Sequence, residues 1–193
     1  RMSLVLKDAG LRPKVTVSGL GGERIAECSG YLFNLGTTRL LGLIPDKTMA
    51  GQRTVRIRFD GKGAVYDVRR KALVGNGEQF EATIEPAVPR LFAIVSDPVE
   101  ELQASAPVAA KRGEEIQVAF TAITGPGFRS VARVEVLGPA GQVVDYYGRN
   151  EDIVDQRGAF RFRTALNDPE GLWKIVITDV VSGQRATVEL RIQ

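Results

Sequence analysis

The 193-residue chain contains 44% hydrophobic and 25% charged residues, a composition typical of a globular protein of one or two domains. Its formal net charge of +3 comes from 26 basic and 23 acidic residues, so no strong charge excess points to a polyanionic partner. The chain has no histidine and one cysteine, which excludes Ser-His-Asp and Cys-His catalytic sites, intrachain disulfides and multi-cysteine metal sites.

Two further absences concern membranes and export. No stretch approaches 18 consecutive apolar residues, so we expect no membrane span. The start of the chain, RMSLVLKDAG, lacks the apolar core and cleavage pattern of a signal peptide. The single cysteine, Cys28, lies in a hydrophobic run, where we expect a small buried apolar side chain rather than a reactive thiol.

The first half of the chain alternates apolar and polar residues with a period of two. In TVRIRFDG, for example, Val55, Ile57 and Phe59 share one face, which is typical of a half-buried strand. Turn sequences such as NLG, FDGKG and VGNG separate these runs, and GLGGER at 19–24 is also predicted to be a turn. The predicted strands are 14–18, 24–35, 38–44, 53–60, 63–70, 79–85 and 90–96.

The second half repeats this pattern after Pro98, which interrupts strand pairing and marks a domain break near residue 97. Seven strands in about 95 residues are typical of an immunoglobulin-like sandwich. Trp173 keeps step with Ile175 and Ile177, so we predict that it lies in the core. The predicted strands are 99–105, 114–123, 129–137, 142–148, 158–165, 171–180 and 184–192.

The run VYDVRR, residues 65–70, combines an acid with two arginines on a predicted strand. Alternation places Tyr66 inward and sets Asp67 beside Arg69 on an exposed face, where an ion pair contributes about 0 to 1 kcal/mol. A glycosidase acid would need a second carboxylate across a cleft, and the sequence offers none. We therefore interpret this run as scaffold.

The same region is the most basic part of the chain. If 53–60 and 63–70 form a hairpin through FDGKGA, a cationic stripe that includes Arg56, Arg58, Arg69 and Arg70 would form and could bind a polyanion. No exposed aromatic residues are interleaved to stack on bases, so we expect no nucleic-acid partner. A solvated face that discourages edge pairing is the alternative interpretation.

The segment DYYGRNEDIVDQRG, residues 145–158, combines two adjacent tyrosines with several acids. In an extended strand, Tyr146 and Tyr147 would point to opposite faces, which leaves one exposed for stacking on a sugar ring. The acids lack the regular spacing of a calcium loop, so no metal site is expected. The alternatives are a sugar contact through a tyrosine and a simple polar connection.

Two stretches resemble a known group of proteins. AVYDVRRKALVGNGEQFEATIEPAVPRLFAIV, residues 64–95, resembles the closing β-sandwich that follows the catalytic barrel in bacterial beta-galactosidase-like glycoside hydrolases. ALNDPEGLWKIVITDVVSGQRATVELRI, residues 165–192, resembles the immunoglobulin-like module that often follows it. RRKALVG is more basic than the usual version of its turn. The catalytic carboxylates of such proteins lie on the barrel, and no residue here matches them.

Together these observations predict an all-β chain of two tandem antiparallel β-sandwich domains, residues 1–97 and 98–193, the second immunoglobulin-like. The resemblance implies a non-catalytic accessory region of an extracellular or periplasmic bacterial protein. Its expected partner is a catalytic module of the same polypeptide or a partner subunit, and no cofactor is required. The alternative is a carbohydrate-binding module that holds a polysaccharide through Tyr146 or Tyr147.

Overall fold

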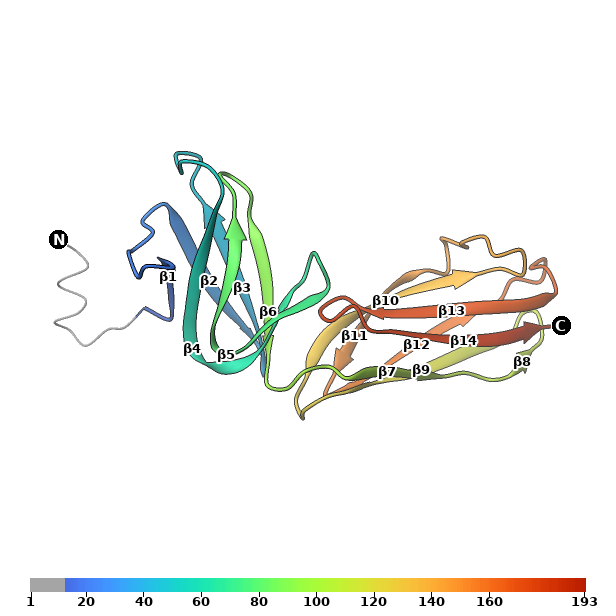
Figure 1. Cartoon of the computed structure of the whole chain (residues 1–193). Coiled ribbons are helices and arrows are strands. Elements are labelled where there is room, and N and C mark those ends of the chain that lie inside the picture. Colours follow the sequence, from blue (N-terminus) through green and yellow to red (C-terminus); the bar gives the residue numbers. More distant parts are fainter. Residues whose placement is uncertain (1–12) are drawn as a thin grey trace.

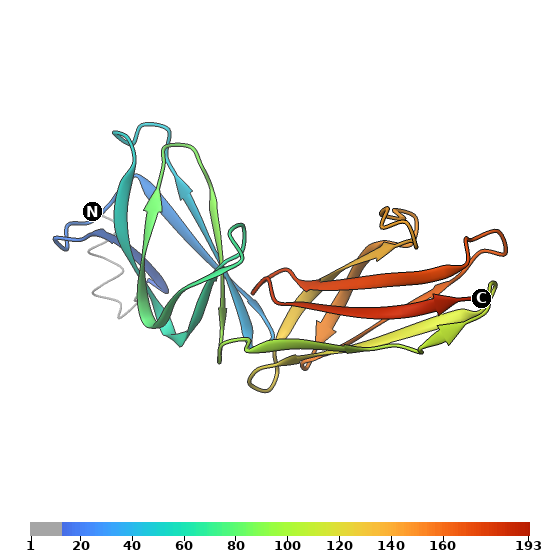
Figure 2. The same cartoon turned by 45° about the vertical axis from the view of Figure 1, so that its right-hand side comes forward.

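The computed structural model describes residues 13–193 and is built of strands (Figure 1). It confirms the predicted fold class, two antiparallel β-sandwich units, which lie end to end in both cartoon views (Figures 1 and 2). Among these residues no helix has the length and hydropathy needed to cross a bilayer. The prediction about an export signal falls on residues 1–12 and lies outside the described part of the chain.

The first unit is a six-stranded sheet that folds over its own core. Its strands follow the order β1-β4-β6-β3-β2, and β5 also pairs with β4. The long strand β4 belongs to both layers, because its first half pairs with β1 and its second half with β6. The strands are β1 (Val15–Gly19), β2 (Cys28–Leu35), β3 (Thr38–Pro45), β4 (Arg53–Asp67), β5 (Ala72–Ile84) and β6 (Arg90–Val95).

The hairpin predicted at FDGKG is wrong, because β4 runs through this sequence without reversing. The ladder with β5 instead skips from Arg58 to Gly63, so the intervening residues form a bulge at which the strand bends. Gly61, with φ of 82°, supplies the left-handed conformation inside the bulge. The true hairpin partner of β4 is β5, reached through a turn at residues 68–71, and β5 begins seven residues earlier than predicted.

Alternation along these strands builds the first core. Leu41, Phe92 and Ile94 point inward from β3 and β6, and meet Ile57 and Phe80 from the opposite layer. The rings of Phe80 and Phe92 lie 4.8 Å apart in an edge-to-face arrangement, which favours the aromatic pair beyond its buried area. The core therefore joins the two layers directly.

The second unit has two layers whose inner faces meet in a second core. One layer is β7-β9-β12, and the other is β11-β10-β13-β14-β8, joined to the first by the pair Val154↔Arg157. The strand β8 runs parallel to β14. The strands are β7 (Glu101–Ser105), β8 (Ala109–Ala110), β9 (Glu115–Ile123), β10 (Arg129–Leu137), β11 (Arg149–Val154), β12 (Arg157–Arg163), β13 (Gly171–Asp179) and β14 (Arg185–Ile192).

The strand predicted at 142–148 is wrong. This segment carries a turn at 145–147, and the strand β11 follows it, in the acidic stretch that was interpreted as a connection. β11 turns into β12 through Asp155 and Gln156, both with positive φ, as a two-residue type I′ hairpin requires. The prediction missed β11 because the acids there reduce the hydrophobic alternation to the single buried residue Ile153.

The predicted core position of Trp173 is confirmed. Its side chain is 1% exposed, beside Ile175 and Ile177 on the inner face of β13. The indole N–H donates to the carbonyl of Pro169 at 3.0 Å, so the one polar atom of the side chain has a partner. Trp173 is thus a structural residue.

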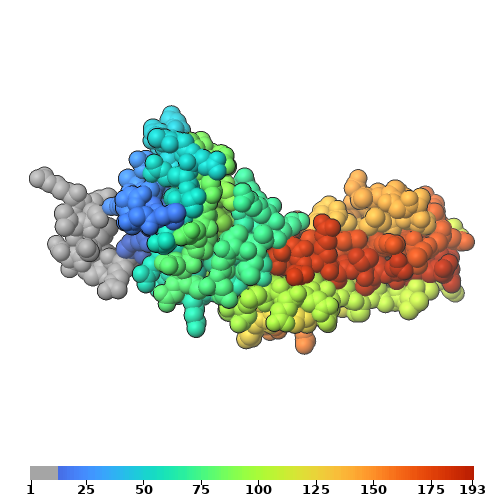
Figure 3. All heavy atoms as spheres, viewed as in Figure 1, coloured from blue at the N-terminus to red at the C-terminus, as the bar shows by residue number. Residues whose placement is uncertain are grey.

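The two units also share buried contacts. Ala64, Tyr66, Ala93 and Val95 lie on the face of the first unit that points away from its own core, and they pack into the core of the second unit. In Figure 3 the β13–β14 end of the second unit abuts the first unit. Their turns meet closely, because a Cβ placed on Gly183 would lie 2.6 Å from Cβ of Lys71.

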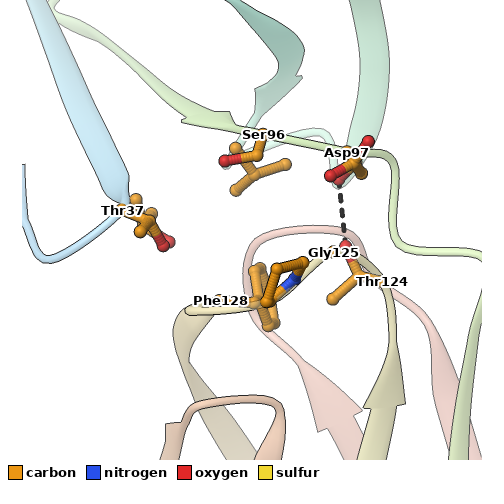
Figure 4. Close-up of a pocket in the computed structure, with 9 residues that line it drawn as sticks. Thr37, Ser96, Asp97, Thr124, Gly125 and Phe128 are labelled. Carbon is orange, nitrogen blue, oxygen red and sulfur yellow. Dashed lines mark hydrogen bonds between the residues drawn. The ribbon is translucent and has the colours of Figure 1, made fainter.

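Hydrogen bonds fix the connection between the units. The Thr38 hydroxyl donates to the carbonyl of Arg129 at 2.7 Å and accepts the N–H of the same residue at 3.1 Å. The hydroxyl of Thr124 donates to the carbonyl of Asp97 at 3.0 Å, beside a small hollow lined by both units (Figure 4). The chain passes from the first sheet to the second through residues 96–100.

Tyr66→Phe is expected to lower the free energy of unfolding by about 1–3 kcal/mol, because it leaves a buried N–H without its acceptor. The Tyr66 hydroxyl accepts the N–H of Val99 at 2.8 Å in the junction between the units. Urea denaturation measures the change. Tyr31→Phe is the control, since the exposed Tyr31 side chain should tolerate loss of its hydroxyl. An unfolding free energy equal to that of the wild type would contradict the role given to Tyr66.

Candidate functional surfaces

Asp67 does not lie on an exposed face, so its predicted pairing with Arg69 in solvent is wrong. The residue is 1% exposed and forms an ion pair with Arg90. Its other carboxylate oxygen accepts the N–H groups of Arg69 and Arg70, both at 3.1 Å. Asp67 therefore closes the turn after β4 and anchors Arg90, as part of the scaffold.

The four arginines of the predicted cationic stripe fall at two separate places. Arg56 and Arg58 lie in the first half of β4, where they pair with Glu81 at 2.9 Å and Glu78 at 3.4 Å on the adjacent β5. Arg69 and Arg70 lie beyond the far end of β4, in the exposed turn to β5. The structure therefore does not bring the four together, and acids partly neutralise the first pair.

Tyr146 and Tyr147 lie in a turn at one end of the second unit, where a buried acid joins them. Tyr146 is 74% exposed and its hydroxyl donates to Asp168 at 3.4 Å. The Tyr147 hydroxyl donates to Asp168 at 2.6 Å and accepts the N–H of Ala165 at 2.8 Å. The two rings lie 4.5 Å apart, tilted by 58°. One tyrosine is therefore exposed, in a turn rather than a strand.

Tyr147 acts as a brace for the core. Its ring lies 4.9 Å from that of Phe162 and 6.1 Å from that of Trp173. Burial, together with the hydrogen bond to Asp168, raises the pKa of Tyr147 to about 12 from 10.0. The exposed ring of Tyr146 is therefore the part of this pair that is open to a ligand.

The stability of the second unit is expected to fall as the pH rises from 10 to 12, because unfolding releases Tyr147 to ionise at its ordinary pKa. The folded state favours the neutral phenol, so its contribution is fully present below pH 10 and is lost above it. Denaturant unfolding across this range measures the slope. Tyr147→Phe should show a shallower slope than the wild type, and an equal slope in the two proteins would contradict the assignment.

Cys28 is half-buried at the start of β2, against the first core. Burial raises the pKa of its thiol, so the protonated form is favoured. The predicted role as a small apolar side chain agrees with this position. Among residues 13–193 no three Cys, Asp or Glu side chains gather closely enough to hold a metal ion.

The largest feature that sequence reasoning missed is an exposed apolar face on the first unit. We call it the outer face. It is formed by large side chains that point away from the first core on the neighbouring strands β2, β3 and β6. Its members are Tyr31, Phe33 and Leu35 from β2, Ile44 from β3 and Leu91 from β6.

The strand register places these side chains on one surface. Gly42 of β3 lies opposite both Tyr31 and Leu91, and residues paired in this way point to the same side of a sheet. A Cβ on Gly42 would meet no atom within 4 Å, so the surface is open between these two side chains. The face continues along β6 into Ala93, which the second unit covers.

A signal for the outer face is present in the sequence. The runs YLFNL, LLGLI and LFAIV are apolar at consecutive positions, whereas a strand with one solvated face alternates. Such runs are typical of strands that are buried on both faces. Here one side meets the first core, and the second unit covers only part of the other side.

Comparison with known proteins adds no assignment. Neither a scan against protein-family models nor a search of curated proteins found a match to this chain.

Proposed function

We propose that the chain is a non-catalytic accessory region of a larger glycoside-hydrolase-like protein, and that the outer face packs against its catalytic module or a partner subunit. The single observation that carries the proposal is the outer face itself. Phe33, the most exposed of its five side chains, is 61% exposed, and a monomeric protein rarely leaves several large apolar residues together in water.

The junction between the two units supports this role. The part of the same surface that includes Ala93 and Val95 is already an intramolecular packing surface with the second unit. A folded module placed against the outer face would extend that interface across β3 and β2. Aromatic residues such as Tyr31 and Phe33 are enriched in protein interfaces, where burial of their rings contributes much of the affinity.

The charges on the chain fit packing better than capture of a polyanion. Arg56 and Arg58 are paired with acids, and Arg69 lies far along β4 from both. The members of the outer face carry no charge. Apolar burial therefore supplies the attraction to the partner, at roughly 25 cal/mol for each Å² of apolar surface removed from water.

The test uses Leu91→Lys in the natural protein that contains this chain, with a tag on the chain. After any covalent connection to the catalytic module is cut, hydrolysis of a chromogenic aryl galactoside is measured in the fraction that stays on the tag. We expect Leu91→Lys to release the activity, because a lysine would be buried in the interface. Val108→Lys is the control at a position that is 86% exposed in the second unit.

Two results would contradict the proposal. Activity that stays with Leu91→Lys as fully as with Val108→Lys would show that the outer face does not hold the module. Hydrolysis by the isolated chain would show that the chain is itself catalytic.

A second function, carbohydrate binding, is favoured by the exposed ring of Tyr146. Its hydroxyl contact with Asp168 and its packing on Tyr147 hold the ring at the surface, and a sugar can stack on such a ring. On a glycan array, this proposal expects specific retention that Tyr146→Ala abolishes and Tyr31→Ala preserves. Equal retention by the two variants, or none by the wild type, would contradict it.

A further inference from the structure

The backbone edge of β2 is a second interaction surface, distinct from the outer face. β2 lies at the end of the strand order β1-β4-β6-β3-β2, and within residues 13–193 no ladder covers its other side. Val15 of β1 approaches β2 near Gly30, so the open edge runs from Tyr31 to Leu35. Exposed edges are normally protected by a charged residue, a proline or a bulge, and β2 has none of these.

The turn after β2 determines which backbone groups face outward. Gly36, with φ of 63°, fits the first position of a two-residue type II′ hairpin, in which the flanking pair Leu35↔Thr38 is hydrogen-bonded. Hydrogen-bonded and non-hydrogen-bonded pairs alternate along an antiparallel ladder. The N–H and C=O groups of Leu32 and Asn34 therefore point away from β3, toward the open edge.

We propose that this edge pairs antiparallel with the same edge of a second copy of the chain, around a twofold axis at Phe33. In this register Leu32 of one copy lies opposite Asn34 of the other, so the outward-pointing backbone groups meet and exchange two hydrogen bonds at each of two places. The proposal concerns the edge alone and stands independently of the proposed function.

The side chains favour a second copy over an unrelated strand. The same register sets Phe33 opposite Phe33 and Tyr31 opposite Leu35 of the second copy, so every large residue on the outer side of β2 gains an apolar cross-strand neighbour. β2 carries no charge in a chain that is 25% charged, so identical strands do not repel each other. A twofold pairing of this kind is self-complementary and closes as a dimer.

Sedimentation equilibrium of the isolated chain over a range of concentrations tests the proposal. The wild type is expected to dimerise reversibly. Asn34→Pro removes an edge N–H from each copy, and with it two hydrogen bonds from the dimer, so it should raise the dimer Kd by about 10- to 100-fold. It leaves the β2–β3 ladder intact, because this N–H does not point toward β3. Asn34→Lys is a second variant, which adds like charges near the axis.

Leu91→Lys is the matched control, since Leu91 lies on β6, two strands away from the edge. It should dimerise as the wild type does, and circular dichroism confirms that each variant is folded. A wild type that is monomeric at every concentration would overturn the proposal. So would Asn34 variants that dimerise as tightly as the wild type, or a dimer that Leu91→Lys abolishes.

Discussion

Trp173→Ala is expected to lower the free energy of unfolding by about 3–5 kcal/mol, because it removes the largest fully buried side chain and leaves a cavity. The loss also orphans the ring contacts of Tyr147 and the carbonyl of Pro169. Since a domain is stable by only about 5–15 kcal/mol, this single change removes much of the stability of the second unit. Guanidinium denaturation measures the effect.

The neighbouring residue provides a control for the tryptophan. Leu172 is adjacent in β13 but points to the opposite, exposed face, so Leu172→Ala should change the unfolding free energy by less than about 1 kcal/mol. A loss for Trp173→Ala that is no larger than the loss for Leu172→Ala would contradict its place in the core.

Asp67→Ala is expected to cost about 3–5 kcal/mol of stability, because it leaves the guanidinium of Arg90 buried without its carboxylate. The Arg90 side chain is 11% exposed, and it also donates to the carbonyl of Thr83 at 3.0 Å. The substitution further removes the acceptor for the N–H groups of Arg69 and Arg70. Urea denaturation of the isolated chain measures the loss.

An exposed ion pair on the same strands provides the comparison. Glu78→Gln breaks the contact with Arg58, where both side chains are largely exposed, and should change stability by at most about 1 kcal/mol. Equal effects of Asp67→Ala and Glu78→Gln would contradict the buried role of Asp67.

Alternation of apolar and polar residues was enough to predict the fold class and most strands. In β9, Ile116, Val118 and Phe120 point into the core as the period of two requires, and Trp173 follows the same rule on β13. The pattern does not show how long a strand is. The bulge in β4 looks like a turn in the sequence, because glycine and aspartate serve both structures.

The sequence also could not predict which unit covers a buried residue. Tyr66 and Ala64 alternate with Val65 along β4, but Val65 packs in the first core, whereas the other two pack against the second unit. The same limit explains the error at Asp67. Its pairing with Arg90 depends on the position of β6 beside β4, a contact between residues 23 positions apart.

The candidate surfaces divide in the same way. An exposed tyrosine at Tyr146 or Tyr147 followed from the residue types, although the buried acid Asp168 that holds them is distant in sequence. The outer face required the order of β2, β3 and β6, because only the sheet brings Phe33, Ile44 and Leu91 onto one surface. Consecutive apolar residues in these strands indicate two-sided burial without naming the second partner.

Hydroxyl-radical footprinting tests most directly whether the outer face is an interface, by comparing the isolated chain with the same chain inside its natural protein. Ile44 and Leu91 lie away from the β2 edge, so pairing between copies does not cover them. We expect both to react in the isolated chain and to be protected in the natural protein, while Tyr146 reacts in both. Equal reactivity of Ile44 and Leu91 in the two samples would contradict the account.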